Sequence, residues 1–195
     1  MGDRARGAGC LGCPPRRAES LEVHAHGVVV RTRRGRDVIC FEDVNEVWYE
    51  LDAHALSGVR VARNPALRLV DHNGLSHRVE LLGGRAVEAL QWILRNCTDR
   101  LLEDARASLR QGETLTFANV RIDREGIRFG ERGKHAWKDL RLVRLQPGRI
   151  AFFRGQTVFP WRKVNLDSVP HPPLFLKLVR ELAPCAEIDD PLAPR

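Results

Sequence analysis

The sequence of 195 residues contains an internal repeat, and this repeat constrains the fold more strongly than any other feature. The clearer copy, GIRFGERGKHAWKDLRLVRL, covers residues 126–145, and a fainter copy, GVVVRTRRGRDVICFEDVNEV, covers residues 27–47. Both begin with Gly and strand-forming residues, pass through a basic turn and reach an aromatic-x-Asp-aliphatic step, WKDL in one copy and FEDV in the other. A supersecondary unit is therefore predicted to be used twice, and the chain length favours two small domains.

Alternating apolar and polar residues predict several short strands in the first half. They are expected over residues 21–26, 28–31, 38–41 and 44–51. On the last of these strands Val47 and Tyr49 face one side of the sheet, and Trp48 faces the other. Residues 31–36 form a basic turn between the second and third strands.

The next hairpin can be given a register from its pattern. With a three-residue loop at 72–74, Leu67 and Leu69 lie opposite Val79 and His77. A two-residue loop would instead place both leucines opposite charged residues. Because a slip of one residue moves every side chain to the other face, we expect the three-residue loop, with its glycine in the left-handed conformation.

After Gly84 the apolar residues are spaced by three and four, which predicts an amphipathic helix that ends before Gly112. Its apolar stripe consists of Val87, Leu90, Leu94, Cys97, Leu101, Ala105 and Leu109. Thr98 is a suitable N-cap, so the sequence leaves open whether the helix is continuous or restarts at that residue.

The second half repeats this order of elements. Strands are expected over residues 115–122, with a local irregularity, and over 127–129, 135–137, 140–145 and 150–153. In the last pair Val143 is expected opposite Phe152, and Phe159 and Trp161 are expected on the same buried face of a further strand. A final amphipathic helix begins near His171 and ends at Pro184.

These patterns divide the chain into five segments. They are a disordered tail at 1–18, a first unit at 19–97, a helical linker at 98–112, a second unit at 113–185 and an unstructured acidic tail at 186–195. The second unit contains a complete set of strands and a closing helix, so it is predicted to fold alone.

Each unit, a set of short antiparallel strands followed by one helix, resembles the pleckstrin-homology-like (PH-like) superfold. The aromatic-x-Asp-aliphatic step is similar to the W-x-D-I turn of bacterial members, and the resemblance extends to uncharacterised actinobacterial-type proteins with two such units. It implies an α+β, mainly β fold of two bent antiparallel sheets, each closed by a C-terminal amphipathic helix. The aromatic residue would then plug the open end of the sheet, and the Asp would cap the following turn.

The net charge of +7 and the pI of about 9.7 raise the question of an anionic partner. The basic residues are 28 Arg and only 4 Lys, a skew that GC-rich coding alone would produce. Both a functional basic surface and scattered, solvated arginines are compatible with this composition.

The cysteines and the apolar runs indicate a soluble, cytoplasmic protein. The five cysteines form no regular framework, as is typical of a reducing compartment. Cys10 and Cys13 have the spacing of half a zinc site without a second pair nearby, so we expect free thiols there. No run is apolar enough to span a bilayer or to act as a secretory signal.

No catalytic, metal or cofactor motif stands out. His24 and His26 share one face of a strand, but the sequence places no third metal ligand near them. Cys40 lies in an apolar run and is expected to be a small core residue. Without a phosphate loop, a nucleophile elbow or a helical His pair, we expect a non-enzymatic protein that binds no cofactor.

The PH-like resemblance implies binding, and it leaves two alternatives. The first is a peptide or partner protein held in the groove between a sheet edge and the C-terminal helix. The second is peripheral attachment to anionic lipid headgroups through Arg31, Arg33, Arg34 and Arg36, because arginine forks suit phosphate. The second copy offers Arg128, Arg132 and Lys134 in the same region. Nucleic-acid binding is not expected, because the aromatic residues of the second sheet are assigned to the core.

Overall fold

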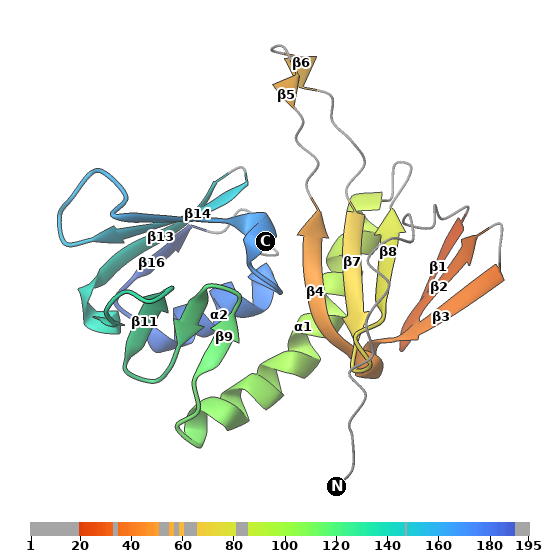
Figure 1. Cartoon of the computed structure of the whole chain (residues 1–195), viewed down its shortest axis with the longest axis horizontal. Helices are drawn as coiled ribbons and strands as arrows, with labels where there is room; N and C mark the ends of the chain where they lie inside the picture. The colour runs from red at the N-terminus through yellow and green to blue at the C-terminus, as the bar shows by residue number, and fades with distance from the viewer. Residues whose placement is uncertain are drawn as a thin grey trace, which may run out of the picture.

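The fold of the protein, seen in a computed structural model, is α+β and mostly β (Figure 1). The structure describes residues 20–32, 35–50, 55–56, 59–60, 66–80, 86–146 and 148–189. Within these ranges there are two α-helices, α1 Ala86–Arg110 and α2 Pro172–Leu182. The predicted tail at 1–18 lies outside the described residues.

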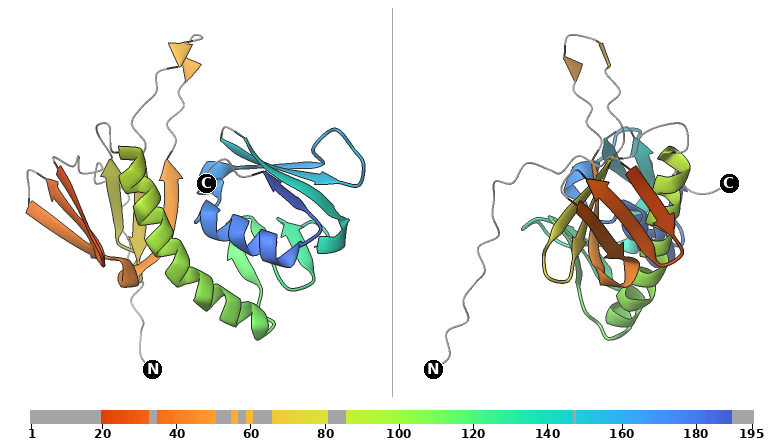
Figure 2. Two further views of the ribbon diagram at one scale, coloured as in Figure 1. Left: turned by 180° about the vertical axis from the view of Figure 1, so that it is seen from behind. Right: turned by 90° about the vertical axis from the view of Figure 1, so that its right-hand side faces the viewer.

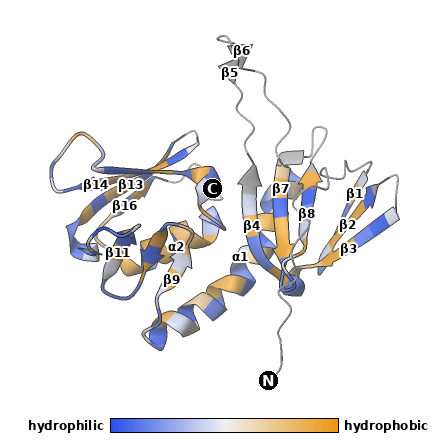
Figure 3. Ribbon diagram, viewed as in Figure 1, coloured by the Kyte–Doolittle hydropathy of each residue, from blue (hydrophilic) through white to orange (hydrophobic). Residues whose placement is uncertain are grey.

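The first half contains two three-stranded antiparallel sheets, in the orders β1-β2-β3 and β4-β7-β8. Their strands are β1 Ser20–His24, β2 Gly27–Thr32, β3 Gly35–Cys40, β4 Val44–Glu50, β7 Ala66–Asp71 and β8 Ser76–Glu80. A separate pair is formed by β5 Ala55–Leu56 and β6 Val59–Arg60. Strand β7 is mainly orange in Figure 3, and its Leu67 and Leu69 are buried on either side of the half-buried Arg68.

The predicted register of the β7–β8 hairpin is confirmed. Leu67 lies opposite Val79 and Leu69 opposite His77. The Asp71 N–H donates to the Leu75 carbonyl (3.0 Å), which closes a loop of three residues. Gly74 has φ +77°, the left-handed conformation that this loop requires.

Helix α1 is continuous through Thr98, which settles the alternative that the sequence left open. Thr98 is buried, and its hydroxyl donates to the Leu94 carbonyl one turn earlier, so it does not act as an N-cap. The predicted stop is confirmed, because Gly112 has φ +83° and the Glu113 N–H donates to the Ser108 carbonyl (3.0 Å).

The second half contains two four-stranded sheets, in the orders β12-β11-β10-β9 and β15-β14-β13-β16. The first consists of β9 Leu115–Phe117, β10 Val120–Ile122, β11 Gly126–Phe129 and β12 His135–Ala136. The second consists of β13 Leu140–Gln146, β14 Arg149–Arg154, β15 Arg162–Asn165 and β16 Glu187–Asp189. Val143 lies opposite Phe152, as the pattern predicts.

Three details of the second half differ from the prediction. Residues 115–122 are a tight hairpin, β9–β10, and not one irregular strand, because Ala118 takes a left-handed conformation (φ +53°) that reverses the chain. Phe159 is 82% exposed in the β14–β15 loop and is not a core residue, while Trp161 is half-buried. Part of the tail after residue 186 forms a strand, β16, which pairs in parallel with β13.

The two glycines that begin the repeat have the same local geometry. A Cβ atom added to Gly27 would lie 2.3 Å from the Ile39 carbonyl oxygen, and one added to Gly126 would lie 2.1 Å from that of His135. In both copies the glycine is paired across the sheet with the residue that precedes the aromatic of the step. Only Gly permits this close approach of two backbones, which explains why both copies begin with it.

The aromatic-x-Asp-aliphatic steps also have a common structure. They form short 3-10 helices, η1 Phe41–Asp43 and η2 Trp137–Asp139, whose aromatic side chains are buried. The predicted cap by each Asp is not what closes these turns, because Asp43 and Asp139 are exposed and backbone hydrogen bonds close them instead. The strand after each turn, β4 or β13, has an irregularity near its start.

Replacing Trp137 by Ala is expected to lower the free energy of unfolding by about 3 to 5 kcal/mol, from lost apolar burial plus a cavity. The ring is only 6% exposed, and its Nε1 donates to the Asp123 carbonyl (2.8 Å). Trp48→Ala is expected to cost much less, because that ring is half-buried beside Arg68 and Glu46. Urea unfolding of both variants measures the difference, and equal losses would contradict it.

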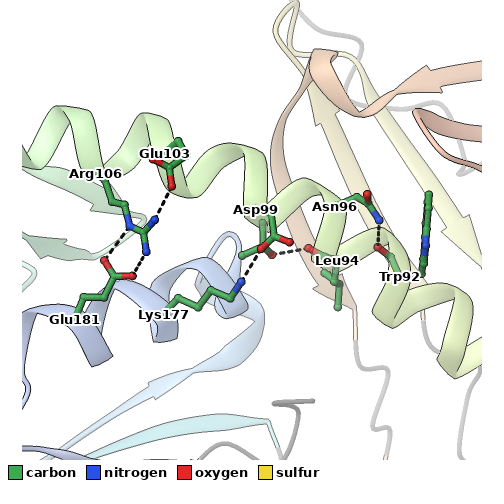
Figure 4. A network of polar contacts seen from close by, with 9 residues as sticks. Trp92, Leu94, Asn96, Asp99, Glu103, Arg106, Lys177 and Glu181 are labelled. Atoms are coloured by element: carbon green, nitrogen blue, oxygen red, sulfur yellow. Dashed lines mark hydrogen bonds and ion pairs between the residues drawn. The ribbon is translucent and has the colours of Figure 1, made fainter. Parts of the chain in front are cut away.

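The two halves meet along α1 and α2. The N-terminal part of α1 contributes Ile93, Leu94 and Cys97 to the first core, and its C-terminal part contributes Leu102, Ala105 and Leu109 to the second. Two ion-pair contacts join the helices in Figure 4, Arg106 Nε to Glu181 Oε2 (3.1 Å) and Lys177 Nζ to Asp99 Oδ1 (2.7 Å). Both are at the surface, so each contributes little beside the packing of α1 into the two apolar cores.

Candidate functional site

The basic turn of the first half is only partly described. Arg31 on β2 lies opposite Arg36 on β3, and both side chains are exposed. Arg31 Nη2 lies 2.7 Å from Glu22 Oε1, so one candidate ligand is already paired with a carboxylate. Arg33 and Arg34 lie outside the described residues. Headgroup binding by these four arginines stays a prediction.

Among the corresponding basic residues of the second half, Lys134 is paired with two carboxylates. Lys134 Nζ contacts Asp123 Oδ2 (2.8 Å) and Glu125 Oε2 (2.6 Å), and these hydrogen bonds raise the pKa of the lysine. Burial acts to raise the pKa of Asp123, but Lys134 and two backbone N–H groups outweigh it and lower that pKa. Lys134 therefore fixes the β10–β11 turn, while Arg128 and Arg132 are exposed.

An occupied sheet edge in the second half is the best-defined candidate binding site. Strand β16 lies along the edge of β13, with Val143 paired to Ile188 and Leu142 to Glu187, and it also contacts α2. Ile188 is half-buried against the second core, whereas Glu187 and Asp189 are exposed. A short extended segment thus lies along the edge of β13 and contacts the C-terminal helix (Figure 1).

The chemistry of this edge matches the segment that it holds. Arg144 on β13 donates from Nε to Asp189 Oδ2 (3.0 Å), so an acidic residue of the segment meets a basic residue of the strand. The backbone supplies affinity along such an edge, and a pocket for alternate side chains supplies selectivity. Here Ile188 packs against the second core, and Arg144 meets the carboxylate of Asp189.

The corresponding edge of the first half, along β4, contacts the second half. The His171 N–H donates to the Val47 carbonyl (2.7 Å), and Arg100 Nη2 donates to the Val44 carbonyl. Part of this edge is therefore occupied by residues that join the two halves, which leaves the β13 edge as the better candidate for an external ligand.

His171 is a buried histidine with unusual surroundings. It is 3% exposed, has φ +53°, and neither ring nitrogen has a hydrogen-bond partner among the described residues. Burial, reinforced by the charge of Arg100, lowers its pKa to about 3. The imidazole is therefore neutral at physiological pH. It can take up a proton in acid only at a low pH or when the packing around it opens.

The remaining candidate nucleophiles and metal ligands do not converge. Burial raises the pKa of Cys97 to about 12, so this thiol stays protonated, and Cys40 is half-buried. His24 and His26 are exposed, and His24 Nε2 lies 3.6 Å from Glu22 Oε2. Among the described residues no three His, Cys, Asp or Glu side chains gather closely enough to hold a metal ion. Cys10 and Cys13 lie outside the described residues.

The sequence predicted a site between a sheet edge and the C-terminal helix but did not identify the edge as β13, because the segment that lies along it belongs to an acidic, proline-containing tail. The only signal is the three-residue alternation Glu187-Ile188-Asp189, which is too short to identify a strand by itself.

The fold is α+β, mostly β, and its best-defined candidate site is the β13 edge, along which β16 lies. Residues 15–184 match the model of a family of unknown function, DUF6585. The match covers most of the chain, so the protein belongs to the DUF6585 family. A search of curated proteins finds no match. In the described part of the chain, no helix is long and apolar enough to cross a membrane.

Proposed function

We propose that the chain consists of two PH-like units and acts as a non-enzymatic module that binds an extended segment of a partner protein. The support for two units is the repeated local geometry. Both halves have a backbone approach at a glycine, a buried aromatic on a 3-10 turn, and an irregularity near the start of the next strand. In each half the strands are followed by one helix.

The proposed binding site is the groove between β13 and α2, and the observation that carries the proposal is its occupation by β16. The partner would displace β16 and pair with β13 as a new strand. Its ligand segment would place an aliphatic side chain where Ile188 lies and an acidic side chain beside Arg144. The proposed partner segment is therefore extended and acidic, with a single buried aliphatic residue.

The test uses the chain truncated after Ala186, which lacks β16, and a fluorescent peptide with the sequence of residues 186–195. The truncated chain is expected to bind this peptide in a polarisation assay. The intact chain is expected to bind at least about tenfold more weakly, because its tethered β16 competes at a high effective concentration. A chain truncated after Asp189 keeps β16 and serves as the matched control. It is expected to bind the peptide as weakly as the intact chain does.

Two further measurements make the outcome specific. A peptide with Ile188→Asp is expected not to bind, because the groove would have to bury a carboxylate. Peptides selected from a random library by the truncated chain are expected to be acidic around one aliphatic residue. The proposed groove is wrong if the truncated chain gives the amide spectrum of a folded protein but binds neither the peptide of residues 186–195 nor any peptide from the library.

A further inference from the structure

The β14–β15 loop carries an exposed apolar tip that lies outside the strand-binding groove. Val158 and Phe159 are each 82% exposed, the highest values of any large hydrophobic residue in the described part of the chain. The loop, residues 155–161, projects from the outer end of the second half, away from the first half (Figures 1 and 2). A Phe beside a Val at such a tip is costly in water unless something covers it.

The loop that carries this tip is held in place by its own hydrogen bonds. Gly155 has φ +53°, and the Thr157 hydroxyl lies 2.9 Å from the Arg154 carbonyl and 3.2 Å from that of Phe159. Arg141 Nη2 donates to the Thr157 carbonyl (3.2 Å). After the tip, the Trp161 N–H donates to the Phe152 carbonyl (3.0 Å), which returns the chain to the sheet. The tip is therefore presented outward by an ordered loop.

Basic side chains lie near the base of this loop and on the strand that follows it. Four exposed residues form what we term the basic collar, namely Lys138, Arg141, Arg154 and Lys163. Three of them line an open hollow together with Gly155, Gln156 and one acidic residue, Asp139. No collar residue forms an ion pair with another described residue, although Arg154 contacts the rings of His135 (Nη1 to Nδ1, 3.4 Å) and Trp161. The loop that carries the apolar tip thus has three cations and one carboxylate in the hollow at its base, and Lys163 on the strand that follows it.

We infer that this loop docks on an anionic membrane surface, with Val158 and Phe159 in the interfacial layer and the collar on the lipid headgroups. A projecting tip of two side chains is far smaller than the roughly 800 Å² that each partner contributes to a stable protein interface. A lipid interface needs no complementary pocket, and its negative potential attracts basic residues beside an inserted apolar group. Size, shape and charge therefore all favour the membrane as the occupant.

The test is co-sedimentation of the full chain with vesicles of phosphatidylcholine, alone or mixed with phosphatidylserine. The intact chain is expected to sediment with the anionic vesicles and much less with the neutral ones. Val158→Ser with Phe159→Ser is expected to weaken binding at least about tenfold, because the tip supplies the apolar contact. The matched control is Leu75→Ser, which removes another exposed apolar side chain (59% exposed) and is expected to change nothing.

The collar is tested by Lys138→Gln with Lys163→Gln, which avoids the residues that hold the loop. Each lost cation is expected to weaken binding to anionic vesicles by about fivefold, and binding is expected to fade as salt shortens the Debye length from about 10 Å at 0.1 M to about 3 Å at 1 M. All variants are expected to keep the melting temperature of the intact chain.

Three results would overturn the inference. One is the absence of binding to anionic vesicles. Another is binding that survives the change of both tip residues but disappears when Arg31, Arg33, Arg34 and Arg36 become Gln, which would move the membrane contact to the first half. The third is self-association of the intact chain, by gel filtration, that the tip variant abolishes, which would make the tip a protein contact. Because the tip lies outside the β13 groove, these results are independent of the peptide experiment.

Discussion

A fragment of residues 113–189 is expected not to fold by itself, whereas a fragment of residues 98–189 is expected to fold. The reason is that the second core is completed by the C-terminal part of α1, through Leu102, Ala105 and Leu109, all of them buried. Losing two buried leucines costs about 4 to 10 kcal/mol. The total stability of a domain of this size is about 4 to 11 kcal/mol, so the shorter fragment is left without a margin.

The longer fragment begins at a favourable residue. Thr98, which is buried inside α1 in the intact chain, becomes the N-terminal residue of the shortened helix, where its hydroxyl can cap the first turn. The fragment loses the hydrogen bonds that the His171 N–H and the Arg100 side chain donate to carbonyls of β4, and we expect these losses to be tolerated. Amide NMR spectra of the two fragments are the measurement, and only the longer fragment is expected to give a dispersed spectrum. A dispersed spectrum from the shorter one would show that α1 is dispensable for the second core.

This revised boundary shows where sequence reasoning was limited. The apolar stripe of α1 was visible from its spacing, including the residues that reach the second core. What spacing cannot show is that the two ends of one stripe pack against different sheets, because periodicity identifies a buried face but not its partner. The division at residue 113 followed from the end of the helix, and the packing of Leu102 and Leu109 argues for an earlier boundary.

The fold itself was largely predictable where side-chain alternation and turn chemistry agreed. The β7–β8 register followed from a single requirement, that Leu67 and Leu69 share a face with Val79, and the glycine loop made that register possible. The β9–β10 hairpin was missed because an alanine, Ala118, occupies the left-handed position that glycine or asparagine normally signals. The preference of alanine for a right-handed backbone was overridden at this position by the pairing of β9 with β10.

The candidate sites were less predictable than the fold. The arginine turn was selected for its composition, yet Arg31 already pairs with Glu22. The β13 edge depends on which segment lies beside it, and Ile188 reaches it only through the tertiary fold. Phe159 was assigned to the core because its spacing from Trp161 suggested a further strand with both on one face, but the chain leaves the sheet after Arg154 and returns at Trp161. Its exposure is what points to the membrane.

The contact between the two halves is expected to weaken in acid because of His171. Its pKa is about 3 in the folded chain and about 6.5 when the chain is unfolded, so between these values only the unfolded state takes up the proton. The unfolding free energy that depends on this neutral ring is fully present above about pH 6.5, and it is lost as the pH falls towards 3. Its full size is about 4 to 5 kcal/mol, since each pKa unit corresponds to about 1.4 kcal/mol.

At about pH 4 the intact chain is expected to have lost about 3 kcal/mol of unfolding free energy through this histidine, compared with about pH 7. His171→Asn removes the titrating ring and keeps a residue that tolerates the left-handed backbone of this position (φ +53°), so its stability at neutral pH changes through packing alone. Other groups, such as Asp123, lose stability in acid in both proteins, and the difference between the two pH dependences therefore isolates His171. Urea unfolding at both pH values is the measurement. Equal acid-induced losses in the two proteins would show that the buried ring accepts its proton without opening the contact with Val47 and Arg100.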